Sequence, residues 1–337
     1  MIRVLIAAGV ALVVSIAVGP RFIEFLRRNE MGQHIREEGP KHHFAKQGTP
    51  TMGGLLILFA ATVGFLPVSH YRLQALTVLF TALACGAIGF LDDFISLTHS
   101  RSLGLSGRWK LILLAVVTAV VGVVAHHLHL SHNVYIPVID VQVPLSYAWY
   151  VFLFVVIAGA SNGTNLADGI DGLLAGTAII ALFTFTAINV VSYVRSGSTP
   201  ADRNLTKLDL AIVGAAMIGA AIGFLWFNAF PAEMIMGDTG SMAFGGALAA
   251  FAIMMKIEAL LLLIGGIFVI EALSVMIQVF SFKRFGRRVF LMAPIHHHFE
   301  MKAWSETKIM VRFWIVGGLL GAVGFAFYYR YYHFFLL

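Results

Sequence analysis

Charged residues are scarce in this chain: aspartate, glutamate, lysine and arginine together make up 12% of its 337 residues. Soluble globular proteins carry about 25%, and the mean hydropathy here is +0.86. This scarcity excludes an ordinary water-soluble domain and indicates a membrane protein. The single cysteine, Cys85, excludes an intrachain disulfide and a multi-cysteine metal site. The sequence also lacks a Walker A motif, which argues against a P-loop nucleotidase.

Long hydrophobic runs, in contrast, are abundant, and ten of them approach the ~20 residues that a bilayer requires. They cover roughly residues 3–26, 52–69, 73–91, 110–129, 146–161, 172–194, 208–227, 239–255, 257–281 and 309–331. The first resembles a signal peptide, but the similar segments after it favour a retained helix. The sequence therefore predicts an all-α polytopic membrane protein, a bundle of about ten transmembrane helices in one domain over residues 1–337.

Lysine and arginine indicate how these segments are oriented. Loops on one predicted side hold five, three and six of them, at 27–50, 92–110 and 281–308. Loops on the other side hold one, none and three, at 70–72, 129–145 and 195–207. The positive-inside rule makes the richer side cytoplasmic and puts both termini outside. The outer loop HNVYIPVIDVQVPL alternates apolar residues with turn formers, which predicts a short periplasmic β-hairpin.

Acidic residues gather on the predicted cytoplasmic side, where five of the eight aspartates end or begin a helix. They are Asp92 and Asp93 in GFLDDF, Asp168 and Asp171 in NLADGIDG, and Asp238 in MGDTGS. A histidine triplet in APIHHHFE and several basic residues share that side: His296, His297, His298, Lys41, Lys46, Arg108 and Lys110. Because hydropathy and basic charge alone set the topology, this convergence is independent evidence for a shared site.

Each motif also has a purely structural interpretation. Asp238 could cap a helix N-terminus, and Asp168 and Asp171 could favour the positive end of a helix. Asp92 and Asp93 could mark the membrane boundary. The histidines could form a solvated loop, since consecutive residues seldom all face one ligand, and the basic residues could bind lipid headgroups.

The functional interpretation treats these groups as one site. Carboxylates that share a cleft repel one another unless a cation or a proton offsets their charge. Several aspartates without cysteine favour a hard divalent ion, and we expect Mg²⁺. Nearby lysine, arginine and histidine side chains would then hold phosphate charge. The residues by themselves predict phosphoryl transfer at the inner face of the membrane.

Five motifs occur in an order that resembles the bacterial phospho-N-acetylmuramoyl-pentapeptide transferases over residues 20–320: EEGPKHHFAKQGTPTMGG, GFLDDF, NLADGIDGL, FNAFPAEMIMGDTGS and APIHHHFE. The histidine triplet favours this branch over the sister enzymes that transfer N-acetylglucosamine-1-phosphate. The resemblance implies an Mg²⁺-dependent transfer of phospho-N-acetylmuramoyl-pentapeptide from its UDP form to undecaprenyl phosphate, giving lipid I and UMP. It also implies the first membrane step of peptidoglycan synthesis, hence of cell wall biogenesis, and a homodimer in the bacterial inner membrane. Membrane lipids are expected partners, and nucleic acid is not.

The resemblance also assigns roles. Asp238 matches the Mg²⁺ ligand, and Asp93 the support of the metal and phosphate site. Asp92 matches the aspartate that deprotonates the lipid phosphate or, in an older scheme, attacks the pyrophosphate itself. The nucleotide pocket is matched by Asn162, Asn165, Asp168 and Asp171, and contacts to the nucleotide by Lys46, Thr51 and Asn228. The phosphate and sugar region is matched by His296, His297 and His298.

Three positions depart from the family pattern: Ser96 replaces a common lysine, Ala167 a threonine, and Ile235 a phenylalanine that can stack on uracil. None of them removes a carboxylate. A second acidic feature, Glu271 inside an apolar run, is either functional or half of a structural pair. An ion transporter is the alternative from another class, but its charged residues would lie near the midplane of repeated halves, and this sequence has no internal repeat.

Overall fold

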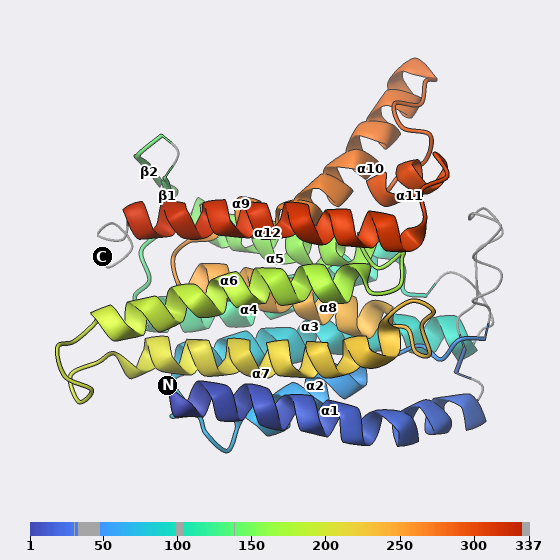
Figure 1. Ribbon diagram of the computed structural model, residues 1–337. Helices are drawn as coiled ribbons and strands as arrows, with labels where there is room; N and C mark the ends of the chain where they lie inside the picture. The colour runs from blue at the N-terminus through green and yellow to red at the C-terminus, as the bar shows by residue number, and fades with distance from the viewer. Residues whose placement is uncertain (30, 33–47, 99–103, 138, 332–337) are drawn as a thin grey trace.

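The structure is a computed structural model that describes residues 1–29, 31–32, 48–98, 104–137 and 139–331. Long helices lie side by side in an elongated bundle (Figure 1). They are α1 (Ile2–Arg28), α2 (Gly54–Phe65), α3 (Leu73–Thr98), α4 (Gly107–His127), α5 (Ala148–Leu166), α6 (Leu173–Arg195), α7 (Leu205–Asn228), α8 (Gly237–Met254), α9 (Glu258–Ile264), α10 (Gly266–Phe285), α11 (Ile295–Glu300) and α12 (Glu306–Arg330). Lys46 lies outside the described residues.

The multi-pass, all-α prediction is confirmed, but the ten predicted spans are not all long apolar helices. Within the part of the chain that the structure describes, eight helices are long and apolar enough to cross a membrane. The second predicted span holds only the 12 residues of α2, which rise about 18 Å. The eighth, which corresponds to α8, is also not among these eight helices. The ninth breaks at Gly265, between α9 and α10, and α10 is the part of it that is long and apolar enough. After this break α10 diverges from the bundle (Figure 1).

The helices run between two distinct ends of the bundle. A two-stranded antiparallel hairpin, β1 (Asn133–Ile136) and β2 (Val141–Pro144), marks one end, which we call the hairpin end. The opposite end, where α3 ends and α8 begins, is called the site end. Helix α1 starts and α12 finishes at the hairpin end (Figure 1), as an even number of crossings requires.

The hairpin confirms the strand prediction for the loop between α4 and α5. Val134 pairs with Val143, and Tyr135 pairs with Gln142. The Tyr135 hydroxyl donates to Asp140 Oδ1 at 2.6 Å, and Asp140 itself has a φ of +52°. Aspartate tolerates this left-handed region better than most residues, which suits it to a turn.

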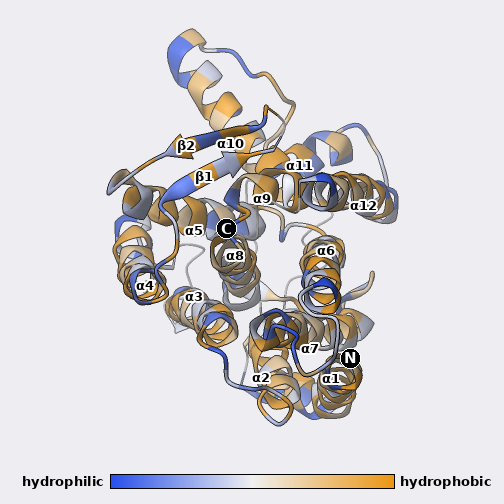
Figure 2. Ribbon diagram, turned by 90° about the vertical axis from the view of Figure 1, so that its left-hand side faces the viewer, coloured by the Kyte–Doolittle hydropathy of each residue, from blue (hydrophilic) through white to orange (hydrophobic). Residues whose placement is uncertain are grey.

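Helix α8 lies at the centre of the bundle, surrounded by α3, α5, α6 and α9 when viewed along the helix axes (Figure 2). All of its residues from Thr239 to Met254 are buried. Its many glycines and alanines allow this, because small residues let helix backbones approach closely. At Gly89 in α3, a Cβ would stand 2.1 Å from the carbonyl oxygen of Asp238. Close packing thus places the head of α8 against the end of α3.

Candidate active site

A lysine joins two of the predicted site carboxylates at the site end. Asp92 lies near the end of α3, Asp238 in the first turn of α8, and Lys110 in the first turn of α4. Lys110 Nζ is 2.8 Å from Asp238 Oδ2 and 3.2 Å from Asp92 Oδ1. Sequence reasoning noted Lys110 only as a basic neighbour and missed this bridge. The available signal was its position at the head of the helix that follows the aspartate pair.

Asp93 caps helix α8 from the neighbouring helix. Its Oδ1 accepts the backbone N–H of Asp238 at 3.0 Å. Its Oδ2 accepts the Thr239 backbone N–H at 3.0 Å and the Thr239 hydroxyl at 2.7 Å. These bonds satisfy N–H groups that a helix start leaves open. The interpretation of Asp238 as the cap is therefore wrong: Asp93 caps α8, and the Asp238 side chain is left to face Lys110.

The Asp92 carboxylate is held by two donors. Besides Lys110, it receives the Leu105 backbone N–H, which lies 2.6 Å from Oδ1. A Cβ at Gly104 would stand 2.6 Å from the same oxygen, so only glycine lets the backbone pass so close. The start of α4 thus closes over Asp92 and fixes its orientation.

Asn165, near the end of α5, belongs to the same cluster, and Asn162 does not reach it. Asn165 Nδ2 donates to Ser241 Oγ in α8 at 3.0 Å, and its side chain also hydrogen-bonds Asp238. Asn162 Nδ2 instead donates to Ala158 O in its own helix at 2.7 Å. The structure therefore brings one of the two predicted asparagines to the carboxylates.

Asp168 brings a further carboxyl group to the cluster from the loop between α5 and α6. Its burial, and then the negative charges of Asp238, Asp93 and Asp171, raise its pKa to about 8. Carboxylates repel one another most strongly where water is excluded. Of the described basic side chains, Lys110 bonds two carboxylates of the cluster, Asp92 and Asp238. A proton on one carboxyl group, or a cation bound beside it, would relieve this repulsion.

Asp171 and Asn228 tie two loops of the site end together. Asp171 Oδ2 accepts the Ala232 backbone N–H at 3.1 Å. Asn228 Oδ1 accepts the Gly172 N–H at 3.0 Å, and its Nδ2 donates to Met234 O at 2.9 Å. Asn228 is buried, and both the oxygen and the nitrogen of its amide hydrogen-bond backbone groups. The structure gives it a bracing role, and its predicted contact with a nucleotide stays a prediction.

A cavity of about 610 Å³ opens beside these loops. Its lining residues are Thr49, Asp171, Phe230, Pro231, Ala232, Ile235, Glu300, Ala303, Trp304, Ser305 and Glu306. The volume suits a small-molecule ligand, and the wall combines rings with carboxylates. Sequence reasoning placed Ile235 here and missed Phe230 and Trp304. Phe230 lies inside the motif FNAFPAEMIMGDTGS but was assigned no role there, whereas Trp304 lies outside the motifs, and folding brings both rings to the wall.

Thr51 lies at the junction between this cavity region and the carboxylates. It is buried, and its Oγ1 would stand 2.9 Å from a Cβ at Gly237, whose φ is +73°. The Asp93 carboxylate would be 2.7 Å from the same Cβ. Glycine at position 237 is therefore required both by its left-handed backbone and by the space that two polar side chains occupy.

The histidine triplet lies on the short helix α11, so its placement in a loop is corrected. His296 is buried, with Nδ1 3.0 Å from Glu271 Oε1 of α10. His297 Nδ1 contacts Glu300 Oε2. His298 Nδ1 accepts the Leu291 N–H at 3.1 Å. Because consecutive residues of a helix point in different directions, the three rings contact three different partners.

Two of the histidines also belong to a compact donor cluster. The donor atoms of His296, His297 and Glu300 lie within 4.8 Å of one another, which is compatible with a metal ion. Both rings, however, already use Nδ1 to contact a carboxylate. His298 is turned to Leu291, so a site formed by all three histidines is not what the structure shows.

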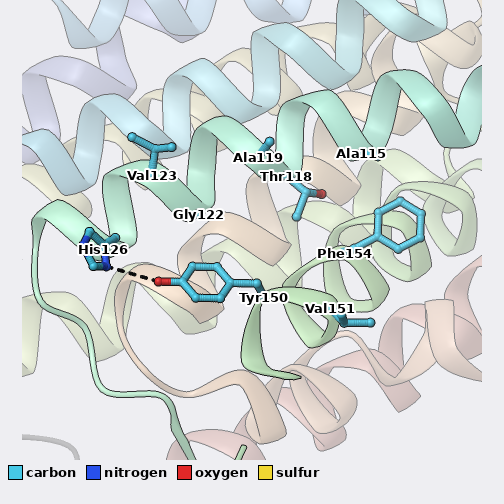
Figure 3. Close-up of a pocket in the computed structure, with 9 residues that line it drawn as sticks. All are labelled: Ala115, Thr118, Ala119, Gly122, Val123, His126, Tyr150, Val151 and Phe154. Atoms are coloured by element: carbon cyan, nitrogen blue, oxygen red, sulfur yellow. Dashed lines mark hydrogen bonds between the residues drawn. The ribbon is translucent and has the colours of Figure 1, made fainter. Parts of the chain in front are cut away.

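A second cavity, of about 570 Å³, lies between α4 and α5. Figure 3 shows its largely apolar wall, with the His126 ring bonded to the Tyr150 hydroxyl at 3.3 Å. None of the lining residues is a carboxylate or a lysine. This cavity therefore lacks the groups that phosphoryl chemistry requires, and the candidate site is the carboxylate cluster with its adjacent cavity.

Comparison with known proteins points to one family. Residues 75–256 match the profile of glycosyl transferase family 4, and residues 46–58 match phospho-N-acetylmuramoyl-pentapeptide-transferase signature 1. The chain is 45% identical to the phospho-N-acetylmuramoyl-pentapeptide-transferase of Rubrobacter xylanophilus over 98% of both chains. It is 46% identical to that of Geobacillus kaustophilus, over 95% of this chain and 96% of the relative. It is 44% identical to that of Bacillus pumilus, over 92% of this chain and 93% of the relative.

Proposed function

Because this chain belongs to the phospho-N-acetylmuramoyl-pentapeptide transferase family, we propose that it forms lipid I. In the proposed reaction, undecaprenyl phosphate attacks UDP-N-acetylmuramoyl-pentapeptide at the phosphate that carries the sugar, and UMP leaves. This is the first membrane step of peptidoglycan synthesis. The observation that carries the proposal is the pairing of Lys110 with both Asp92 and Asp238, together with Asp168, whose carboxyl group interacts with that of Asp238. The whole chain, residues 1–337, would act as one transferase domain.

The residues of this cluster fit Mg²⁺. The acidic side chains offer oxygen atoms, which a hard divalent ion prefers, and two of them, Asp92 and Asp238, share one lysine. Asp238 would hold the ion, since Asp93 already serves α8 as its cap. When bound, Mg²⁺ would supply charge stabilisation to the pyrophosphate and to the departing UMP.

Asp92 and Lys110 would act on the incoming lipid phosphate. Asp92 Oδ1 accepts two hydrogen bonds, from Lys110 and from the Leu105 N–H. Donors on a carboxylate oxygen reduce its nucleophilicity, which favours direct attack by the lipid phosphate over a covalent step through Asp92. Asp92 would take the proton of the phosphate, and Lys110 would hold its negative charge. A phosphate monoester is already a nucleophile, so a weak base is sufficient.

The cavity beside Asp171 would take the nucleotide. Phe230 and Trp304 offer ring surfaces, and Ile235 offers an apolar one, for a planar base. Thr51, beside Gly237, and the cluster members Asn165 and Asp168 would contact the ribose and phosphate groups. Lys46 and the three histidines are proposed to contact the phosphates and sugar, as in the family pattern.

A reconstituted assay tests the proposal. The purified protein, with undecaprenyl phosphate in detergent, should convert UDP-N-acetylmuramoyl-pentapeptide to lipid I and UMP, and removal of Mg²⁺ with EDTA should stop turnover. UDP-N-acetylglucosamine serves as the matched control, because a sister transferase would prefer it. Turnover of the control nucleotide in place of the muramoyl-pentapeptide substrate would contradict the assignment.

The site end is proposed to face the cytoplasm of a bacterial inner membrane, with both termini outside. The lysine and arginine content of the loops supports this orientation. Cysteine placed at Lys302, in a Cys85→Ala background, should react with an impermeant thiol reagent only from inside. Cysteine at Ser131 should react only from outside. Labelling of both positions from one side would contradict the orientation.

We further propose a homodimer, on the strength of the family resemblance. Light scattering on the purified protein in detergent should give twice the chain mass of 36.7 kDa after subtraction of bound detergent and lipid. A protein of single-chain mass with full activity would remove this part of the proposal.

A further inference from the structure

Glu271 is a buried carboxylate with a specific partner. It lies in α10, in the segment that follows the break at Gly265, and none of its surface is exposed. Its Oε1 is 3.0 Å from Nδ1 of His296, which is 1% exposed. A carboxylate accepts hydrogen bonds, so Nδ1 of the ring is the donor in this pair. The chain thus brings an acid from a membrane helix to the first histidine of the triplet.

The other nitrogen of the same ring has no partner. Within the described part of the chain, no group hydrogen-bonds His296 Nε2, although the atom is fully buried. A buried polar atom without a partner costs roughly 1–3 kcal/mol. Native proteins seldom keep such an atom without a reason. Glu271 Oε2 is likewise buried without a partner among the described residues, so the pair carries two unpartnered atoms, which a pair that served only to stabilise the fold would not require.

This free nitrogen points at the loop that carries the two nucleotide-side aspartates. A Cβ at Gly169 would stand 2.3 Å from His296 Nε2, so a side chain at this position would displace the ring. Gly169 lies between Asp168 and Asp171, and the loop continues into a small apolar cluster. That cluster contains Ile170, Leu173, Ile267, Ile309 and Phe313, and it fixes α11 against α6, α10 and α12.

We propose that Glu271 is a positioning residue, which orients His296 so that Nε2 contacts a polar group of the nucleotide sugar. The inference rests on the proposed function and adds a residue that lies away from the reacting atoms. By accepting the Nδ1–H, the carboxylate leaves Nε2 as the one ring nitrogen that can meet substrate. A carboxylate behind a functional histidine fixes both its ring orientation and its tautomer.

A double-mutant cycle on the full chain tests this role. The variants are Glu271→Gln, His296→Ala and the combination, assayed for kcat/KM toward the nucleotide sugar and for the dissociation constant of UDP. Glu258→Gln is the matched control, because Glu258 is also buried but pairs with Lys256 at the hairpin end. Melting temperatures are measured for every variant. Glutamine has nearly the shape of glutamate, so this variant is the one most able to fold.

Glu271→Gln should lower kcat/KM about 10- to 100-fold, the range typical for a group that orients a functional histidine. In the His296→Ala background, Glu271→Gln should lower kcat/KM less than about threefold, because there is no ring left to orient. The Glu258→Gln control should leave kcat/KM within about twofold at a temperature where it is folded.

Equal losses in both backgrounds would overturn the proposal, and so would a Glu271→Gln variant with wild-type kcat/KM. If the wild type forms no lipid I, the proposed function fails. The UDP dissociation constants then test by themselves whether Glu271 positions His296. Weaker UDP binding in Glu271→Gln that disappears in the His296→Ala background supports the positioning role, whereas the same weakening in both backgrounds contradicts it.

Discussion

The two ends of the bundle treat buried acids in opposite ways. At the hairpin end, Asp209 accepts the backbone N–H groups of His70 and Arg72 at 2.8 and 2.9 Å, and the Ser69 hydroxyl at 3.2 Å. Glu258 pairs there with Lys256 at 2.6 Å. At the site end, Asp92 and Asp238 share the Lys110 ammonium, and Asp168 interacts with the charges of Asp238 and Asp93. The two acids at the hairpin end pair with donors rather than with other carboxylates, whereas the site end places several carboxyl groups close together.

This difference separates structural acids from functional ones. A buried charge is tolerated when it is paired and hydrogen-bonded, so the acids at the hairpin end need nothing beyond the protein. Those at the site end repel one another, and either a proton on one carboxyl group or a bound ligand of opposite charge relieves that repulsion. Sequence position alone does not show this, since all of these acids lie at helix ends.

The largest effect should come from Asp238→Asn. Loss of the proposed metal ligand should lower kcat at least about a hundredfold, as the removal of one electrostatic group from an active site does. The melting temperature should change little, because Asp93 rather than Asp238 caps α8. Steady-state kinetics at saturating Mg²⁺ with thermal denaturation measure both. A variant within a few-fold of wild type would put Asp238 among the structural acids.

Lys110→Met should lower kcat by up to about a hundredfold, because it removes the ammonium that Asp92 and Asp238 share. The loss also leaves these carboxylates facing each other, so the melting temperature should fall in EDTA and recover in part with Mg²⁺. Lys302→Met is the control, since Lys302 is exposed. Destabilisation that does not respond to Mg²⁺ would contradict the idea that the cluster lacks a cation.

Asp209→Ala tests the opposite end. It leaves the donors from Ser69, His70 and Arg72 without their acceptor, so the free energy of unfolding should fall by about 2 kcal/mol or more. At a temperature where the variant is folded, kcat and KM should stay near wild type. Turnover lost in the folded variant would mean that the two ends are coupled.

Asp168→Asn should change the pH dependence of stability. Burial and neighbouring carboxylates raise the pKa of Asp168 to about 8, against an ordinary value of about 3.9. Protonation therefore favours the folded state, and this contribution is lost as the pH rises from about 4 toward 8. In EDTA, the variant should melt higher than wild type at pH 8 and similarly at pH 4. If the difference in melting temperature between variant and wild type were the same at every pH, the pKa of Asp168 would not be raised in the folded protein.

The smallest expected effect is that of Ile235→Phe at the cavity wall. An aromatic ring could stack on uracil, and base–aromatic stacking is worth roughly 1–3 kcal/mol in single-stranded nucleic acid binding. Part of this is already supplied by isoleucine, so affinity for the UDP-sugar should rise between a few-fold and about tenfold. The turnover number should not change, because the contact is the same in ground and transition states. Because Ile235 is buried, a lower melting temperature without tighter binding would identify it as a core residue.

Several features could be predicted from the sequence because they depend on local properties of the chain. Hydrophobic runs indicate membrane helices, alternation around Tyr135 indicates the hairpin, and basic loops indicate a common side for the aspartate motifs. The convergence of Asp92, Asp168 and Asp238 follows from that topology. The role of Asp93 as a cap could not be predicted, since its partner Thr239 is 146 positions away.

The sequence by itself determined the membrane class, the order of the segments and which end of the bundle would be acidic, because hydropathy and charge act residue by residue. Only the tertiary structure decided which acids cap, brace or remain unneutralised. That choice depends on distances between helices, and these are set by close packing at Gly89 and Gly104. It likewise decided that Glu271 meets His296, because a buried hydrogen bond requires two groups that only folding brings together.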